Sequence, residues 1–114
     1  MSKDLDRLHL EHMIDAAETI QAYTEAGREA FFEDRMMRDA VVRNLEVIGE
    51  AAKRLSQSLR DQSPEIPWRQ ISGLRDVVIH QYDYVDYNEV WNVVEDDLPG
   101  FLEALSTLVA KRKK

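Results

Sequence analysis

The segment from Arg75 to Tyr82 holds the residues best suited to chemistry. It places Arg75, Asp76, His80 and Tyr82 around the apolar run Val77-Val78-Ile79. A histidine can take a proton from a ribose 2′-hydroxyl or return one to a leaving oxygen. An arginine can hold phosphate oxygens bidentately and stabilise the extra charge of the transition state, and a tyrosine can stack on a base. This set therefore suits cleavage of an RNA phosphodiester without a metal ion.

A helix is expected from Leu74 to about Gln81, and it would decide how these side chains are arranged. Asp76 and His80 are four residues apart, so they would share a helix face, and the carboxylate could fix the tautomer of the imidazole. Arg75 and His80 would flank one side of the helix without stacking. Two chains related by a twofold axis, the commonest oligomer geometry, would bring two arginines and two histidines to one groove.

Apolar periodicity predicts the elements that must position this segment. Helices are expected over 4–26, 34–59, about 68–81 and from Asp86 onward, with a break at Ser63-Pro64-Glu65-Ile66-Pro67 and a kink at Pro99-Gly100. On the first helix, Leu5, Leu8, Met13, Ala16, Ile20 and Tyr23 are expected to share one face. Gly49, Ala51 and Ala52 are small enough for a neighbouring helix to approach closely. The sequence predicts one all-α domain over residues 1–114, an antiparallel bundle of four or five helices.

Composition and charge exclude several classes of protein. The net charge of −7 argues against unspecific coating of DNA, which depends on neutralisation of phosphates by lysine and arginine. The absence of cysteine excludes disulfides and thiolate metal sites and fits a reducing cytoplasm. No apolar run approaches the roughly 20 residues of a membrane helix, and no signal peptide is apparent. We therefore expect a cytoplasmic protein that binds neither DNA nor a membrane and needs no cofactor.

Other polar groups admit two interpretations each. His9 and His12, with Asp15 beyond, could be read as a metal site, but an exposed polar face is the favoured interpretation and no metal is expected. The basic tail 111–114 could guide RNA, although a solvated helix end is favoured because cations suit a helix C-terminus. Trp68 and Trp91 are expected to be core or dimer anchors.

Three further residues lie in or near the same region of the chain. Glu50 could orient the site from a neighbouring helix, or it could be a solvated carboxylate, with nothing to separate the two readings. Tyr84 and Tyr87 follow the segment closely and are weaker functional candidates than Tyr82.

The spacing Arg75-x4-His80-x-Tyr82 resembles the R-x4-H-x-Y motif of the HepT-like toxins, which belong to the HEPN superfamily of helical ribonucleases. Other stretches resemble the same family, namely Leu45-Glu46-Val47-Ile48-Gly49-Glu50-Ala51-Ala52, Pro64-Glu65-Ile66-Pro67-Trp68, and Val90-Trp91 with Asp97-Leu98-Pro99. The similarity spans nearly the whole chain in order and spacing.

The resemblance implies a homodimeric toxin of a bacterial or archaeal toxin–antitoxin pair, with the motif lining a cleft at the dimer interface. It implies metal-free cleavage of RNA, with Arg75 and His80 as catalytic residues. It also implies a partner, a small MNT-type nucleotidyltransferase antitoxin that silences the toxin by transferring AMP to Tyr82, in a complex that could be a larger hetero-oligomer. Asp76 stands where the superfamily usually carries a small polar residue, often Asn, and adds negative charge beside the phosphate site.

A binding module without catalysis is the rival hypothesis. It would be a helical dimer that docks a nucleotidyltransferase and is modified by it. The net charge of −7 and the acidic residues around the motif favour this rival. Toxicity of the chain when expressed alone is expected only for a ribonuclease.

Overall fold

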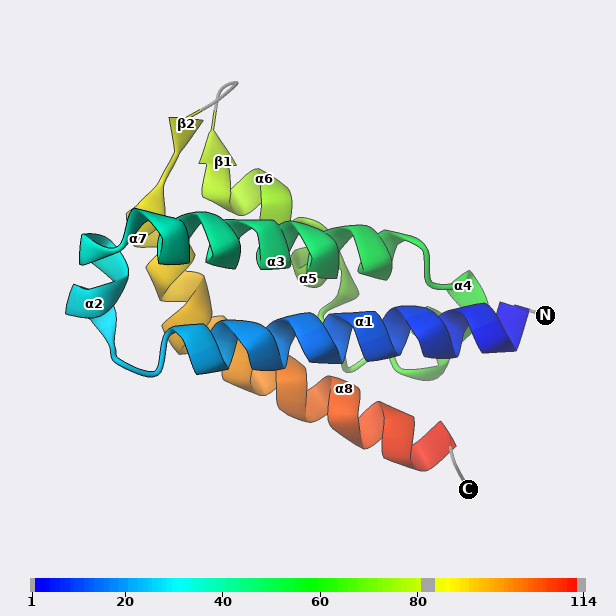
Figure 1. Ribbon diagram of the computed structural model, residues 1–114. Coiled ribbons are helices and arrows are strands. Elements are labelled where there is room, and N and C mark those ends of the chain that lie inside the picture. The colour runs from blue at the N-terminus through cyan, green and yellow to red at the C-terminus, as the bar shows by residue number, and fades with distance from the viewer. Residues whose placement is uncertain (1, 81–83, 113–114) are drawn as a thin grey trace.

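Helices form nearly all of the structure (Figure 1). The computed structural model describes residues 2–80 and 84–112, of which 2–4, 77–80 and 84 are described by their backbone alone. In chain order the elements are α1 (Ser2–Tyr23), α2 (Arg28–Glu33), α3 (Arg35–Lys53), α4 (Gln57–Gln62), α5 (Trp68–Ser72), α6 (Leu74–Val78), β1 (Ile79–His80), β2 (Tyr84–Val85), α7 (Tyr87–Asn92), the π-helix η1 (Val93–Asp97) and α8 (Leu98–Arg112). The predicted all-α class is confirmed, and the helical stretches are divided more finely than expected.

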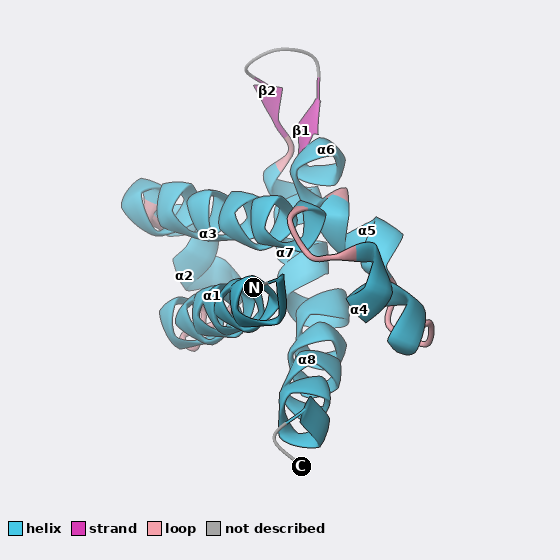
Figure 2. Ribbon diagram, turned by 90° about the vertical axis from the view of Figure 1, so that its right-hand side faces the viewer, coloured by secondary structure: helices cyan, strands magenta, loops and turns pink. Residues whose placement is uncertain are grey.

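Two long antiparallel helices, α1 and α3, form the centre of the fold. They lie side by side, and α8 packs against α1 while α5 and α6 pack against α3 (Figures 1 and 2). The largest side chains at the centre are almost fully buried, and they are Leu10, Met13, Ile20, Phe31, Val41, Leu45, Ile48, Leu59, Ile71, Leu74, Leu98 and Leu105. Burial of this apolar surface is the main force that holds the helices together.

The buried face of α1 differs in part from the predicted one. Met13, Ala16 and Ile20 are buried as expected, with Leu10 and Ala17 beside them. In contrast, the expected members Leu5, Leu8 and Tyr23 are 56%, 44% and 47% exposed. The buried residues follow steps of three and four, which keep one helix face toward the core, whereas the three exposed residues lie to one side of that face.

The helix predicted over 34–59 is interrupted, because α3 ends at Lys53 and α4 begins after Ser56. The hydroxyl of Ser56 caps α4 by accepting a hydrogen bond from the backbone N–H of Leu59 (3.1 Å). Ser56 also donates its backbone N–H and its hydroxyl to the carboxylate of Asp6, at 2.8 and 2.6 Å. Asp6 is only 5% exposed, so this carboxylate ties the start of α1 to the turn between α3 and α4.

The C-terminal helices begin and continue as the sequence predicts, with one irregularity. Asp86 caps α7 by accepting hydrogen bonds from backbone N–H groups that include that of Glu89 (3.2 Å). The interruption predicted at Pro99-Gly100 takes the form of the π-helix η1, in which Leu98 donates its backbone N–H to the carbonyl of Val93. A proline lacks an N–H group and clashes with the carbonyl four residues before it, so a wider turn at this point accommodates Pro99.

Candidate functional site

The segment that carries the motif leaves the helical conformation before His80. Helix α6 ends at Val78, and β1 begins at Ile79, so the expectation of a helix through Gln81 was wrong. The β-branched Ile79 favours an extended backbone, and its pairing with Val85 of β2 (Tyr84–Val85) stabilises that conformation. Asp76 and His80 therefore do not share a helix face, and the helical argument for pairing them fails.

The motif instead extends into a short antiparallel pairing of β1 with β2. Ile79 lies opposite Val85, and His80 lies opposite Tyr84. Figure 2 shows this pair projecting away from the helices, beyond the end of α6. Arg75 and Asp76, the first two predicted site residues, are both exposed on α6. Only the backbone is described at His80, and the predicted modification site Tyr82 lies outside the described residues.

Arg75 is held by a carboxylate that the sequence did not single out. Its Nε atom lies 3.5 Å from Oε2 of Glu46 on α3, and the two side chains are 52% and 26% exposed. Such a partly solvated ion pair contributes little stability, but it orients the guanidinium. Glu50, the residue considered for this orienting role, lies 3.8 Å from Lys53 instead. The only sequence signal for Glu46 is its place in the stretch 45–52 that resembles the HepT-like family.

Gly49 sets the distance between α3 and the segment that leads into the motif. A Cβ atom at this position would lie 3.3 Å from the backbone oxygen of Ser72 and 3.6 Å from that of Ile71. The close helix approach predicted at this glycine is therefore confirmed. Glu46 lies one helical turn before Gly49, so the same close approach brings its carboxylate within reach of Arg75.

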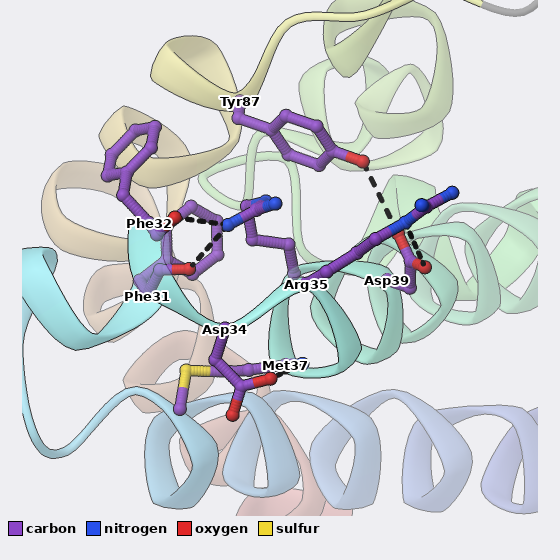
Figure 3. A network of polar contacts seen from close by, with 8 residues as sticks. Phe31, Phe32, Asp34, Arg35, Met37, Asp39 and Tyr87 are labelled. Atoms are coloured by element: carbon purple, nitrogen blue, oxygen red, sulfur yellow. Dashed lines mark hydrogen bonds and ion pairs between the residues drawn. The ribbon is translucent and has the colours of Figure 1, made fainter.

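Tyr87 anchors the chain where it returns from the strand pair to the bundle (Figure 3). Its hydroxyl donates a hydrogen bond to Oδ1 of Asp39 at 3.3 Å. The guanidinium of Arg38 lies 5.0 Å from the centre of the Tyr87 ring and donates to the backbone carbonyls of Phe31 and Phe32. The described contacts of Tyr87 thus serve to fix the start of α7 against the corner between α2 and α3.

The remaining polar candidates lie away from this segment. The rings of His9 and His12 are 6.5 Å apart on α1. Within the described residues, no group of three or more potential metal-binding side chains gathers at one point. Lys111 and Arg112 end α8, whereas the last two residues of the basic tail lie outside the described residues. In the described part of the chain, every helix is too short or too polar to cross a membrane.

Comparison with known proteins places this chain in a sequence family. The family model described as "Ribonuclease HepT-like" matches residues 13–108 of the chain, which includes every helix from α2 to α7. The predicted site residues Arg75, Asp76, His80 and Tyr82 all lie within the matched range. No solved structure matches the chain significantly.

Curated relatives carry related names. A Thermococcus cleftensis protein with the provisional name ribonuclease HepT is 39% identical over 100 residues, which cover 84% of this chain and 91% of the relative. A provisionally named RNase of Caldanaerobacter subterraneus is 33% identical over 108 residues, with 94% and 96% covered. A Methanocaldococcus jannaschii protein, whose name joins a gamma-glutamylcyclotransferase to a provisional RNase, is 35% identical over 115 residues. The match covers 100% of this chain but only 51% of that longer relative.

Proposed function

This chain belongs to the HepT-like ribonuclease family. We propose that it is an endoribonuclease that cleaves RNA without a metal ion and uses Arg75 and His80 as its catalytic residues. The observation that carries the proposal is the Arg75-x4-His80-x-Tyr82 spacing within the range matched by the family model. A second observation supports it, since the guanidinium of Arg75 is half exposed at the surface of α6, where a phosphate can reach it.

The proposed reaction is an attack by the neighbouring 2′-hydroxyl. One His80 imidazole takes the proton from this hydroxyl, and the 2′-oxygen forms a bond to the adjacent phosphorus. The bond from phosphorus to the 5′-oxygen breaks, and the leaving oxygen receives a proton from a second imidazole, His80 of the partner subunit in a twofold dimer. The products are a cyclic 2′,3′-phosphate and a 5′-hydroxyl. Arg75 holds the phosphate oxygens and stabilises the extra negative charge of the transition state.

The biological setting that we propose is a toxin–antitoxin pair. The chain would be the toxin, and an MNT-type nucleotidyltransferase would be the antitoxin that transfers AMP to Tyr82. An adenylyl group at Tyr82, two residues after His80, would place a bulky phosphodiester beside the catalytic imidazole and exclude the RNA. The support for this setting is the match of Tyr82 to the tyrosine of the family motif.

The decisive experiment is the substitution His80→Ala. We expect the variant to lose RNA cleavage by about 10²–10⁴-fold, the usual contribution of a general acid or base, and to lose growth arrest when expressed alone. The matched control is Met36→Ala, because Met36 is 83% exposed at the start of α3. Size-exclusion chromatography should show the same dimer for both variants. Undiminished cleavage by His80→Ala would eliminate the mechanism.

A second candidate function is a non-catalytic dimer that binds and is modified by a nucleotidyltransferase. The exposed carboxylate of Asp76 beside Arg75 and the net charge of −7 favour it, because both disfavour a polyanion. Under this hypothesis the wild-type chain expressed alone causes no growth arrest, yet it still receives AMP from its partner.

A further inference from the structure

A surface groove between α1 and α3 gathers positive charge on a chain that is acidic overall. The groove has a volume of about 360 Å³ and is lined by His9 and His12 from α1, by Arg43 from α3 and by Arg54, which directly follows α3. Among the described residues that line it, Glu50 is the one carboxylate. We call this feature the α1–α3 groove.

The two guanidinium groups of the α1–α3 groove are free to bind a ligand. Arg43 and Arg54 are exposed, and within the described residues neither side chain forms an ion pair or a hydrogen bond. In contrast, Arg75 pairs with Glu46. The charge of Glu50 is partly offset, since its carboxylate lies 3.8 Å from the ammonium of Lys53. The groove therefore presents an uncompensated positive charge.

The position of the groove connects it to the motif. Arg43, Glu46 and Glu50 lie on α3 at steps of three and four. Arg54, at the C-terminal cap of the helix, continues the same stripe. Glu46 belongs to this stripe and also holds Arg75 at 3.5 Å. Arg75 thus lies beside the groove, on the far side of Glu46, and RNA bound in the groove reaches Arg75 where a phosphate displaces the Glu46 carboxylate from it.

The groove also has apolar surface, so its ligand should offer apolar contacts as well as negative charge, and single-stranded RNA offers both. Leu8 is 44% exposed, and Val47 is partly buried against the core, and both line the groove. Single-stranded RNA offers phosphates for cations and unstacked base faces for apolar contacts, whereas a duplex hides its bases. Another groove, along α8, is lined by Glu65, Glu103 and Lys111, so its lining carries a net negative charge that disfavours the same ligand.

We infer that the α1–α3 groove binds the backbone of single-stranded RNA and leads it to Arg75. This inference rests on the proposed ribonuclease function and deepens it, because it assigns a substrate-binding surface outside the motif. The two guanidinium groups contact phosphates, and Leu8 contacts a base.

The test is the double substitution Arg43→Ala/Arg54→Ala, made in the His80→Ala background so that RNA stays intact. Binding of a fluorescein-labelled single-stranded oligouridylate is measured by anisotropy at several salt concentrations. We expect about tenfold weaker binding. The plot of log binding constant against log salt concentration should also become less steep by about 1.4, because each of the two lost phosphate contacts on a single strand removes about 0.7 from the slope. Arg43→Lys/Arg54→Lys keeps both charges and should bind within about threefold of the parent.

The matched control is Arg35→Ala/Lys111→Ala, which removes the same charge from exposed positions outside the groove. It should leave the salt slope unchanged. Equal binding by the groove variant and its parent would overturn the inference, and so would an equal loss in the control, which would indicate net charge alone. These outcomes are separate from the proposed function, which is tested by cleavage: it fails if the wild type does not cleave RNA or if cleavage survives His80→Ala.

Discussion

The guanidinium of Arg75 lies 3.5 Å from the carboxylate of Glu46, across the junction between α6 and α3. The pair thus links the arginine of the motif, on α6, to α3, which lies outside the motif. Arg75 is 52% exposed and Glu46 is 26% exposed, so water screens the attraction and the pair can exchange partners. A phosphate that displaces the carboxylate would find the guanidinium already oriented.

Replacement of Glu46 tests this exchange. Glu46→Gln removes the competing charge, so we expect RNA affinity to rise about twofold to threefold while unfolding free energy changes by less than about 1 kcal/mol. The affinity is measured by anisotropy in the His80→Ala background. Glu103→Gln removes the same charge from the exposed side of α8 and serves as the control. Weaker RNA binding by Glu46→Gln would contradict the exchange and would make Glu46 a positioning residue for Arg75.

The second prediction concerns Gly49, where the backbone of residues 71–72 approaches α3 closely. Gly49→Val places side-chain atoms against the backbone oxygens of Ile71 and Ser72, which a single Cβ would already approach to 3.6 and 3.3 Å. We expect a loss of about 1–3 kcal/mol in unfolding free energy, because overpacking must displace backbone. Gly100→Val is the control, since a Cβ there meets nothing within 4 Å. Urea titration of both variants measures the difference, and equal stabilities would refute the steric argument.

The buried carboxylate of Asp6 makes a third prediction. Asp6→Ala leaves the backbone N–H of Ser56 without its 2.8 Å partner, so we expect unfolding free energy to fall by about 1–3 kcal/mol. Asp15→Ala, an exposed position on the same helix, should change it by less than about 0.5 kcal/mol. Thermal unfolding followed by circular dichroism checks both values. A stability loss no larger than that of Asp15→Ala would show that water replaces the carboxylate.

The modification proposed for Tyr82 makes the fourth prediction. When the chain is expressed together with a cognate nucleotidyltransferase, mass spectrometry should find AMP added to the wild type and to Tyr87→Phe, but not to Tyr82→Phe. Tyr87 is a suitable control because its hydroxyl is already engaged with Asp39 in anchoring α7. AMP on Tyr82→Phe at the wild-type level would place the modification elsewhere in the chain.

Several local features followed from the sequence alone, because each depends on neighbours in the chain. The proline pair predicted the break that separates α4 from α5, and Asp86 predicted the start of α7. The absence of a side chain at Gly49 predicted a close approach by another segment. The motif spacing, taken together with the stretches at 45–52 and 64–68, indicated the family before any comparison, and the family model that matches residues 13–108 confirmed it.

The two wrong helix boundaries also have local causes. Hydrophobic spacing suits a helix over Leu74–Gln81, but the helix ends at Val78, because pairing with β2 holds Ile79 and His80 in an extended strand. Likewise, the apolar period continues through Leu55 and Leu59, which are both buried, so it gave no sign that α3 ends at Lys53.

The sequence by itself determined the helical class, the start of α7 after Asp86 and the family, since each follows from residue types and their spacing along the chain. Only the tertiary structure decided that Glu46 meets Arg75, that Asp6 meets Ser56 and that His9 and His12 share a groove with Arg43. Periodicity shows which face of a helix is buried, but not which distant residue packs against it. Those partners depend on how α1, α3 and α6 pack together, and that packing is set by the shape of the whole core.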